Sequence, residues 1–113
     1  GVTFKANTDD MRDSSSLKMI PALAKKGAKI NYFDPTGLKK EFSKIKNVSY
    51  TDNIKESVKG SDLVIIHTEW NDFKSINFKN LVRGKKFIIY DMRNIYSPIK
   101  IKNQGFKYYS IGR

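Results

Sequence analysis

Short apolar runs alternate with amphipathic stretches from one end of the chain to the other. Residues 63–66 and 87–90 are continuous runs of β-branched and aromatic side chains, a pattern typical of central parallel strands that are covered on both faces. Helical periodicity of apolar positions fills most intervals between such runs. The pattern predicts strands at residues 2–4, 28–33, 48–50, 63–66, 87–90 and 106–110. It predicts helices at about 14–26, 38–45, 53–58 and 97–104, and short helical pieces within 71–82.

Strands that alternate with helices favour a parallel sheet with right-handed crossovers. We therefore expect one α/β domain, residues 1–113, with a Rossmann-like, doubly wound, mostly parallel six-stranded sheet in the order 3-2-1-4-5-6 and helices on both faces. Gly1 opens the chain inside an expected strand, and no initiator Met precedes it. This predicts a piece of a longer polypeptide, either a cloned fragment or the product of a split gene.

Polar side chains gather where three of the expected strands end. Lys5 follows the first strand, His67 and Trp70 follow the fourth, and Arg93 follows the fifth. Doubly wound sheets bind ligands beyond the carboxyl ends of their strands, at the switch point that strands one and four flank. Lys5 and Arg93 are therefore expected to face one crevice and to hold a diphosphate between two cations.

Four of the polar positions have more than one interpretation. We expect His67, the single histidine, to be hydrogen-bonded and structural rather than catalytic. Trp70 either stacks on a base or sugar or packs beneath a loop. Asp34 either contacts a ribose or, as we favour, caps the helix at 38–45. Asp10 or its neighbour Asp9 caps a helix or pairs with Arg12.

The start of the first helix has two candidate caps, and its interior holds an unusual residue. Ser14 or Asp13 is expected to cap the helix at 14–26. Pro21 lies inside that helix, where it removes a backbone hydrogen bond, and the sequence offers no reason for it.

Composition narrows the classes of function. The formal net charge of +11 suggests a nucleic-acid partner. The lysines, however, are spread over several elements as doublets such as Lys25-Lys26 and Lys39-Lys40, which we expect to be solvated, so we do not expect a nucleic-acid partner. The chain has no cysteine, which excludes disulfides, thiolate metal sites and a catalytic thiol, and fits the cytoplasm. No apolar run has the length of a bilayer span, and no G-x-G-x-x-G follows the first strand.

The stretches FKANTDDMRDSSS, HTEWNDF, DMRNIY and GFKYYSIGR, in this order and spacing, resemble the C-terminal, UDP-binding domain of the UDP-glucose/GDP-mannose dehydrogenase family. The resemblance covers essentially the whole chain, and NTDDMRDSSS is most similar to the bacterial branch that oxidises UDP-glucose to UDP-glucuronate. Such enzymes oxidise the C6 alcohol of the sugar in two steps with two NAD, the second step through a thiohemiacetal on a cysteine.

Carried over by motif, the resemblance implies that Phe4 and Lys5 contact the UDP-sugar and that Arg93 contacts it from the strand-five side. It implies that Arg12 reaches NAD bound mainly by an N-terminal domain. The NAD domain, the central helix and the catalytic cysteine of the family lie outside this chain, so the resemblance implies no catalytic residue and no activity here. We expect weak UDP-sugar binding by this chain alone and a homo-oligomer when full length. The alternatives are a dehydrogenase for UDP-N-acetylmannosamine or GDP-mannose, a basic nucleotide-binding module, and a structural remnant of a split enzyme.

Overall fold

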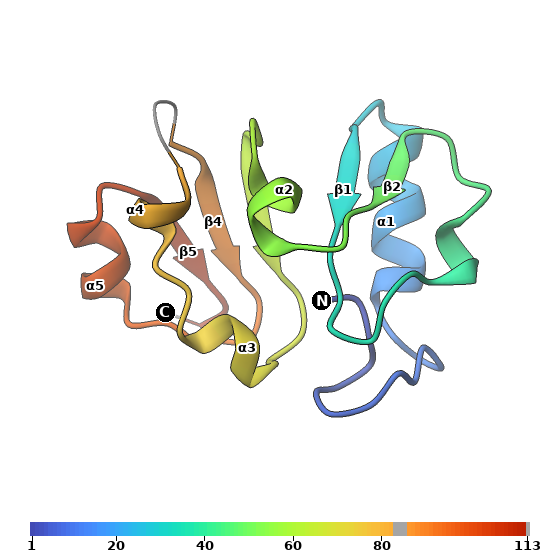
Figure 1. The fold of residues 1–113 in the computed structure, drawn as a ribbon, viewed down its shortest axis with the longest axis horizontal. Coiled ribbons are helices and arrows are strands. Elements are labelled where there is room, and N and C mark those ends of the chain that lie inside the picture. Colours follow the sequence, from blue (N-terminus) through green and yellow to red (C-terminus); the bar gives the residue numbers. More distant parts are fainter. Residues whose placement is uncertain (83–85, 113) are drawn as a thin grey trace.

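The computed structural model describes residues 1–82 and 86–112, in which five strands form two parallel sheets with helices against them (Figure 1). In chain order the elements are α1 (Ser16–Lys25), β1 (Ile30–Tyr32), the 3-10 turn η1 (Lys40–Phe42), β2 (Val48–Tyr50), α2 (Ile54–Val58), β3 (Leu63–Ile66), α3 (Asn71–Lys74), α4 (Phe78–Leu81), β4 (Ile88–Asp91), α5 (Pro98–Asn103) and β5 (Lys107–Ser110).

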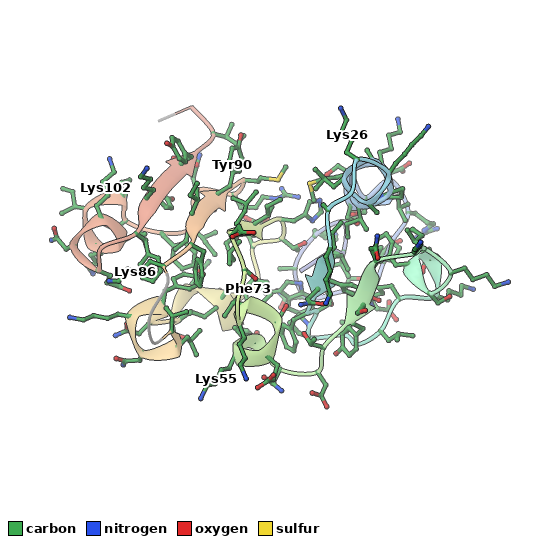
Figure 2. All side chains as sticks on the ribbon, turned by 90° about the horizontal axis from the view of Figure 1, so that it is seen from above. Lys26, Lys55, Phe73, Lys86, Tyr90 and Lys102 are labelled. Atoms are coloured by element: carbon green, nitrogen blue, oxygen red, sulfur yellow. The ribbon has the colours of Figure 1, made fainter. Side chains whose placement is uncertain are left out.

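Both sheets are parallel, as the alternation of strands and helices predicts. β1 pairs with β2, and β3, β4 and β5 pair in that order. The strands run in one direction, with β1 and β3 facing each other across the middle of the molecule (Figure 1). Seen from above, α1 lies on one side of the strands and α2 and α4 lie on the other (Figure 2). The α/β class is therefore confirmed.

The six-stranded sheet in the order 3-2-1-4-5-6 is a wrong prediction, because residues 2–4 form no strand and the sheet is divided between β1 and β3. The backbone N–H of Val2 donates to the Asp34 carboxylate at 2.8 Å. The hydroxyl of Thr68 donates to the carbonyl of Thr3 at 2.9 Å. Bonds to side chains beyond the strand ends thus replace the ladder bonds that a central strand would make.

Two apolar clusters hold the elements together. In the larger one, Phe78 is fully buried and its ring meets those of Phe87, Tyr96 and Phe106 at centroid distances of 5.9, 5.5 and 6.1 Å, all edge to face. This geometry is favourable for aromatic quadrupoles and adds to the burial of apolar area. Figure 2 shows Phe73 of the same cluster at the centre of the molecule, while Lys26, Lys55 and Lys102 lie at its periphery on different sides.

The helix expected at 38–45 is reduced to the 3-10 turn η1. Lys39, just before it, is extended and buried. Its backbone N–H donates to the Tyr32 hydroxyl at 2.9 Å, and its ammonium donates to the Thr36 hydroxyl at 2.5 Å. Because the backbone N–H and the ammonium of Lys39 are both hydrogen-bonded inside the fold, a helix cannot begin at residue 38. Lys39 is therefore not the solvated lysine that its doublet with Lys40 suggests.

The expected cap of α1 is also wrong. Neither Asp13 nor Ser14 caps the helix, which begins at Ser16 without a side-chain cap. The hydroxyls of Ser14 and Ser16 instead donate to the carbonyl of Val2, at 2.7 and 2.6 Å. These serines therefore fasten the N-terminal segment to the helix. Pro21 remains inside α1, and nothing in its contacts explains it.

Two other predicted helix starts are confirmed. The Asn53 side chain accepts from the backbone N–H of Glu56 at 2.8 Å, and the Ser97 hydroxyl accepts from Lys100 at 3.4 Å. Within residues 1–82 and 86–112, no helix is long and apolar enough to cross a bilayer.

Candidate functional site

A buried carboxylate holds the turn that presents Arg93. Asp91, at the end of β4, is fully buried, and its Oδ1 accepts from the backbone N–H of Arg93 at 3.0 Å. Its Oδ2 accepts from the backbone N–H of Tyr96 at 3.0 Å and from the hydroxyl of Tyr108 at 2.7 Å. Burial, and then the charge of Asp91, raises the pKa of Tyr96 above its ordinary value. Three donors on one carboxylate fix the turn, because breaking it leaves a buried charge with unmet acceptors.

The Arg93 side chain joins three segments at the carboxyl ends of the strands. Its Nε donates to the carbonyl of His67, which follows β3, at 2.8 Å. Its Nη2 donates to the carbonyl of Phe4, in the N-terminal segment, at 3.2 Å. A guanidinium carries five N–H donors in a fixed fork, so these two bonds orient the group without using all its donors. In the part of the chain that the structure describes, Nη1 makes no hydrogen bond, and Arg93 is exposed.

Phe4, which contacts Arg93, and its neighbour Lys5 stand at the start of a closed loop. The N–H of Phe4 donates to the carbonyl of Asp10 at 2.9 Å, and the carbonyl of Lys5 accepts from the Thr3 hydroxyl at 2.9 Å. The Phe4 side chain is 45% exposed although it is large and apolar, and Lys5 is exposed as well. The structure thus brings the Phe4 carbonyl against the Arg93 guanidinium at the strand ends, and Lys5 is the next residue along the chain.

Arg12 belongs to a second location. Its Nε and Nη2 donate to the two carboxylate oxygens of Asp10, each at 3.1 Å, so of the two interpretations of Asp10 the structure supports the pair with Arg12. These bonds from Arg12, more than the more remote charge of Lys5, lower the pKa of Asp10. The Arg12 side chain is 89% exposed and lines an open cavity of about 530 Å³ together with Lys39 and Lys40, a cavity that Arg93 does not line.

His67 is hydrogen-bonded, as expected. Its Nε2 lies 2.8 Å from the Ser15 hydroxyl, and its Nδ1 lies 3.0 Å from the Thr68 hydroxyl. Burial, then the charges of the N-terminus and of Arg93, lowers the pKa of His67 to about 4. The ring is therefore neutral at neutral pH and links α1 to the end of β3.

Of the two interpretations of Trp70, the structure supports packing beneath a loop. Trp70 is buried, and its indole N–H donates to the Thr3 hydroxyl at 3.2 Å. A ring held in this way packs beneath the N-terminal segment and presents no face to a base or sugar.

Asp34 follows neither of its two interpretations. Its Oδ2 accepts from the backbone N–H groups of Val2 and Thr3 at 2.8 and 3.3 Å, and its Oδ1 accepts from the N–H and hydroxyl of Thr36 at 2.9 and 2.6 Å. Burial alone would raise its pKa, but the bonds from Thr36 and Val2 outweigh burial and lower the pKa. Asp34 is 1% exposed, so it caps a turn and anchors the N-terminal segment instead of meeting a ribose or starting a helix.

Both buried carboxylates, Asp34 and Asp91, were missed as structural anchors. In an Asx turn, the side chain of an aspartate accepts a hydrogen bond from the backbone N–H two residues later. The stretches DPTG and DMRN are both compatible with such a turn, so the sequence carried this signal. Among the described residues, no cluster of three or more histidine or acidic side chains is arranged to hold a metal ion.

Fold and site together define the class: a parallel α/β domain with an exposed arginine at the carboxyl ends of its strands, the edge where such sheets bind nucleotides. Comparison with known families makes the assignment specific. The family model for the UDP-glucose/GDP-mannose dehydrogenase family, UDP binding domain, matches residues 1–98, and the chain belongs to that family.

Several relatives support this membership. The UDP-glucose 6-dehydrogenase of Rhizobium meliloti (strain 1021) is 38% identical over 114 residues, which are 100% of this chain and 26% of that protein. The UDP-glucose 6-dehydrogenase YwqF of Bacillus subtilis (strain 168) is 37% identical over 117 residues, again 100% of this chain and 26% of that protein. The chain thus spans about a quarter of the length of the curated relatives it matches.

Solved structures share the fold. The crystal structure of an NDP-N-acetyl-D-galactosaminuronic acid dehydrogenase from Methanosarcina mazei Go1 has a TM-score of 0.82 at 25% identity, and the match covers 100% of this chain and 23% of that one. A UDP-glucose dehydrogenase from Pyrobaculum islandicum has a TM-score of 0.73 at 24% identity, covering 97% of this chain and 23% of that one, which shows the fold alone.

Proposed function

We propose that this chain is the UDP-sugar-binding part of a UDP-glucose 6-dehydrogenase, which oxidises UDP-glucose to UDP-glucuronate with two NAD. The relatives that carry this enzyme name match the chain along its whole length. The structural observation that carries the proposal is the Arg93 guanidinium, which joins the end of β3 to Phe4 and keeps unused donors toward solvent.

The chain's own residues in this proposal bind and orient the nucleotide. Arg93 donates N–H groups to the pyrophosphate, because a guanidinium edge matches two phosphate oxygens at once. Lys5 supplies the second cation from the neighbouring segment. Phe4 contributes its exposed ring and the backbone that Arg93 already touches. With no cysteine in the chain, the thiol chemistry of the second oxidation falls to the remainder of the enzyme.

Arg12 is the residue that would meet NAD, which accepts the hydride when it is bound and is held mainly by the N-terminal domain of the same enzyme. Arg12 fits this role in that it is exposed beside an open cavity, which Lys40 and the carboxylates of Asp9 and Glu41 also line. Asp10 balances much of its charge through two hydrogen bonds, so we assign Arg12 a polar contact and not the main phosphate clamp. A cytoplasmic location and a homo-oligomeric state are parts of the same proposal.

A dehydrogenase for another nucleotide sugar is the second candidate. The observation that favours it is the TM-score of 0.82 with a structure whose title names an NDP-N-acetyl-D-galactosaminuronic acid dehydrogenase. In either case the nucleotide end of the substrate is the part that this chain binds.

A competition assay with a fluorescent UDP derivative tests the proposal. UDP and UDP-glucose should displace the probe, and a mixed-sequence oligonucleotide should not, at both about 50 mM and about 200 mM salt. Arg93→Ala and Lys5→Ala should weaken probe binding, whereas Lys100→Ala, which removes an exposed cation from α5, should not. Displacement by the oligonucleotide with a steep salt dependence would replace the proposal with a basic nucleic-acid-binding module. Unchanged affinity in both site variants would leave a structural role for the chain.

A further inference from the structure

The charges of this chain are distributed unevenly along the sequence. After Asp72 the one acidic residue is Asp91, whereas lysine and arginine recur every few positions from there on. Asp91 is fully buried, and its carboxylate is bound by Arg93, Tyr96 and Tyr108, so it faces the interior. The surface that this part of the chain builds is therefore positively charged.

The fold brings several of these lysines together around the end of α5. The Lys86 ammonium donates to the carbonyl of Gln104, the residue that follows α5, and lies 5.1 Å from the centre of the Phe106 ring. The backbone N–H of Lys79, in α4, donates to the Gln104 side chain at 3.2 Å. Elements that are separate in the sequence thus form one surface.

Four exposed lysines of this surface define what we call the basic end: Lys79, Lys86, Lys100 and Lys102. Figure 2 shows Lys86 and Lys102 at the same end of the molecule, away from Lys26. In residues 1–82 and 86–112 the one ion pair joins Asp10 to Arg12, so no described carboxylate pairs with a lysine of the basic end. These like charges repel one another, and an anion bound among them would relieve the repulsion.

The helix α5 also presents an apolar side chain to solvent among these lysines. Ile99 is 72% exposed, whereas Ile101 of the same helix is 3% exposed and belongs to the larger core cluster. Successive residues of an α-helix are rotated by about 100°, so Ile99 points away from the core, with Lys100 on one side of it and Lys102 on the other. The basic end therefore combines cations with an aliphatic side chain that the core does not cover.

This combination distinguishes between the polyanions that a basic surface can bind. Lysines alone would serve a nucleic acid, an acidic protein segment or an anionic bilayer, because each offers negative charge. An exposed isoleucine gains nothing from the phosphate backbone of a nucleic acid, but it leaves water when it enters the headgroup region of a bilayer. Basic side chains around an aliphatic one are typical of proteins that lie on membrane surfaces.

We propose that the basic end, with Ile99 at its centre, is a docking surface for an anionic lipid bilayer. The lysines contact lipid phosphates, and Ile99 enters the headgroup region. A lysine close to an anionic bilayer strengthens binding about fivefold, so four lysines give reversible binding. The inference uses neither Arg93 nor Phe4, and it holds whether or not the domain binds UDP.

Sedimentation of the chain with lipid vesicles tests the proposal. One kind of vesicle is phosphatidylcholine alone, and the other is a two-to-one mixture of phosphatidylcholine and phosphatidylglycerol. The chain should bind the mixed vesicles at about 0.1 M salt and leave them at about 1 M salt, because the screening length falls from about 10 Å to about 3 Å. It should not bind phosphatidylcholine alone.

A variant with reversed charges locates the binding surface. It carries Lys79→Glu, Lys100→Glu and Lys102→Glu, all at exposed positions where the fold should tolerate the change. Lys86 stays in place because it packs on the Phe106 ring.

A control variant with the same net charge carries three substitutions in the last turn of α1 and just after it: Lys25→Glu, Lys26→Glu and Lys29→Glu. These three lysines are exposed as well, and Figure 2 shows Lys26 away from the basic end. The basic-end variant should bind the mixed vesicles at least about tenfold more weakly than this control.

A labelling experiment examines Ile99 directly. The chain has no cysteine, so Ile99→Cys carries a single environment-sensitive dye. The emission of this dye should shift to shorter wavelength on the mixed vesicles, and the emission of the same dye on Lys26→Cys should not.

Three results would overturn the proposal: no binding of the unsubstituted chain to the mixed vesicles, equal loss of binding in the two charge variants, or the same emission shift at both dye positions. Tighter binding of a mixed-sequence oligonucleotide or of polyglutamate than of the vesicles, lost in the basic-end variant, would also overturn it. The basic end would then be a surface for a nucleic acid or an acidic protein segment.

Discussion

Replacing Asp91 by asparagine tests how Arg93, which we propose to bind the nucleotide, is positioned. Asn keeps the size of the side chain and one oxygen, which can still accept from the backbone N–H of Arg93. At the other oxygen an amide NH₂ now faces the N–H of Tyr96 and the hydroxyl of Tyr108, both of which donate in the native fold. The substitution therefore places donors against donors in a site without solvent.

The magnitude follows from these contacts. A hydrogen bond to a charged group contributes about 1.5–3 kcal/mol, and a buried donor left unpaired costs about 1–3 kcal/mol. The Tyr108 hydroxyl can rotate and accept from the new NH₂, whereas the Tyr96 N–H cannot move. We therefore expect Asp91→Asn to lower the free energy of unfolding by about 3 kcal/mol. Tyr108→Phe, which removes one donor only, should cost about 1.5 kcal/mol.

Urea denaturation of the two single variants and the double variant measures these values. Because the two side chains are in direct contact, their effects should not add, and the coupling should be about 1 kcal/mol. UDP binding should weaken in Asp91→Asn under conditions where the variant is folded, since the turn that aims Arg93 is loosened. A loss below about 0.5 kcal/mol in Asp91→Asn, or strict additivity, would refute the carboxylate anchor.

Three further predictions concern other parts of the fold. The pKa of His67 is lowered from 6.5 to about 4 in the folded state, so its neutral form stabilises the fold above pH 6.5. This contribution, up to about 3 kcal/mol, is lost as the pH falls toward 4. A pH series of urea midpoints should show a shallower acid slope in His67→Gln, and identical slopes in the two proteins would contradict the assignment. Gly1→Ala should lower the melting temperature, because the new Cβ would lie 2.9 Å from the side chains of Thr68 and Phe73 and overpacking costs about 1–3 kcal/mol. An unchanged melting temperature would show that Gly1 is not tightly packed against these side chains. Pro21→Ala should raise the free energy of unfolding by about 1 kcal/mol, since alanine restores a backbone donor inside α1. A lower free energy of unfolding in this variant would mean that packing of the proline ring stabilises the helix.

The sequence predicts the parallel α/β class because its strongest signals are local. The apolar runs that become β3 and β4 stand out in composition, and the caps Asn53 and Ser97 act on residues only three positions away. The strand expected at residues 2–4 could not be judged in this way, and it does not form. Whether this segment pairs with a strand depends on residues far along the chain, and bonds to Asp34 and Thr68 hold it beyond the strand ends.

The candidate site was predictable in part for the same reason. Arg93 follows the recognisable strand β4, so its place at the carboxyl edge follows from the topology of a parallel sheet. Lys5 follows a segment that forms no strand, so its place depends on the contacts of that segment. The sequence carries the signal of an Asx turn at Asp34 and Asp91, but it does not show that these carboxylates are buried. Asp91 becomes an anchor only when Tyr108, 17 residues later, is folded against it.

The central claim is that UDP binds where Arg93 joins Phe4, and its most direct measurement is a nuclear magnetic resonance titration of the ¹⁵N-labelled chain with millimolar UDP. The account predicts concentration-dependent shifts at the amides of Phe4, Lys5 and Arg93, and their loss in Arg93→Ala. Shifts confined to other residues, or the same shifts in Arg93→Ala, would contradict it.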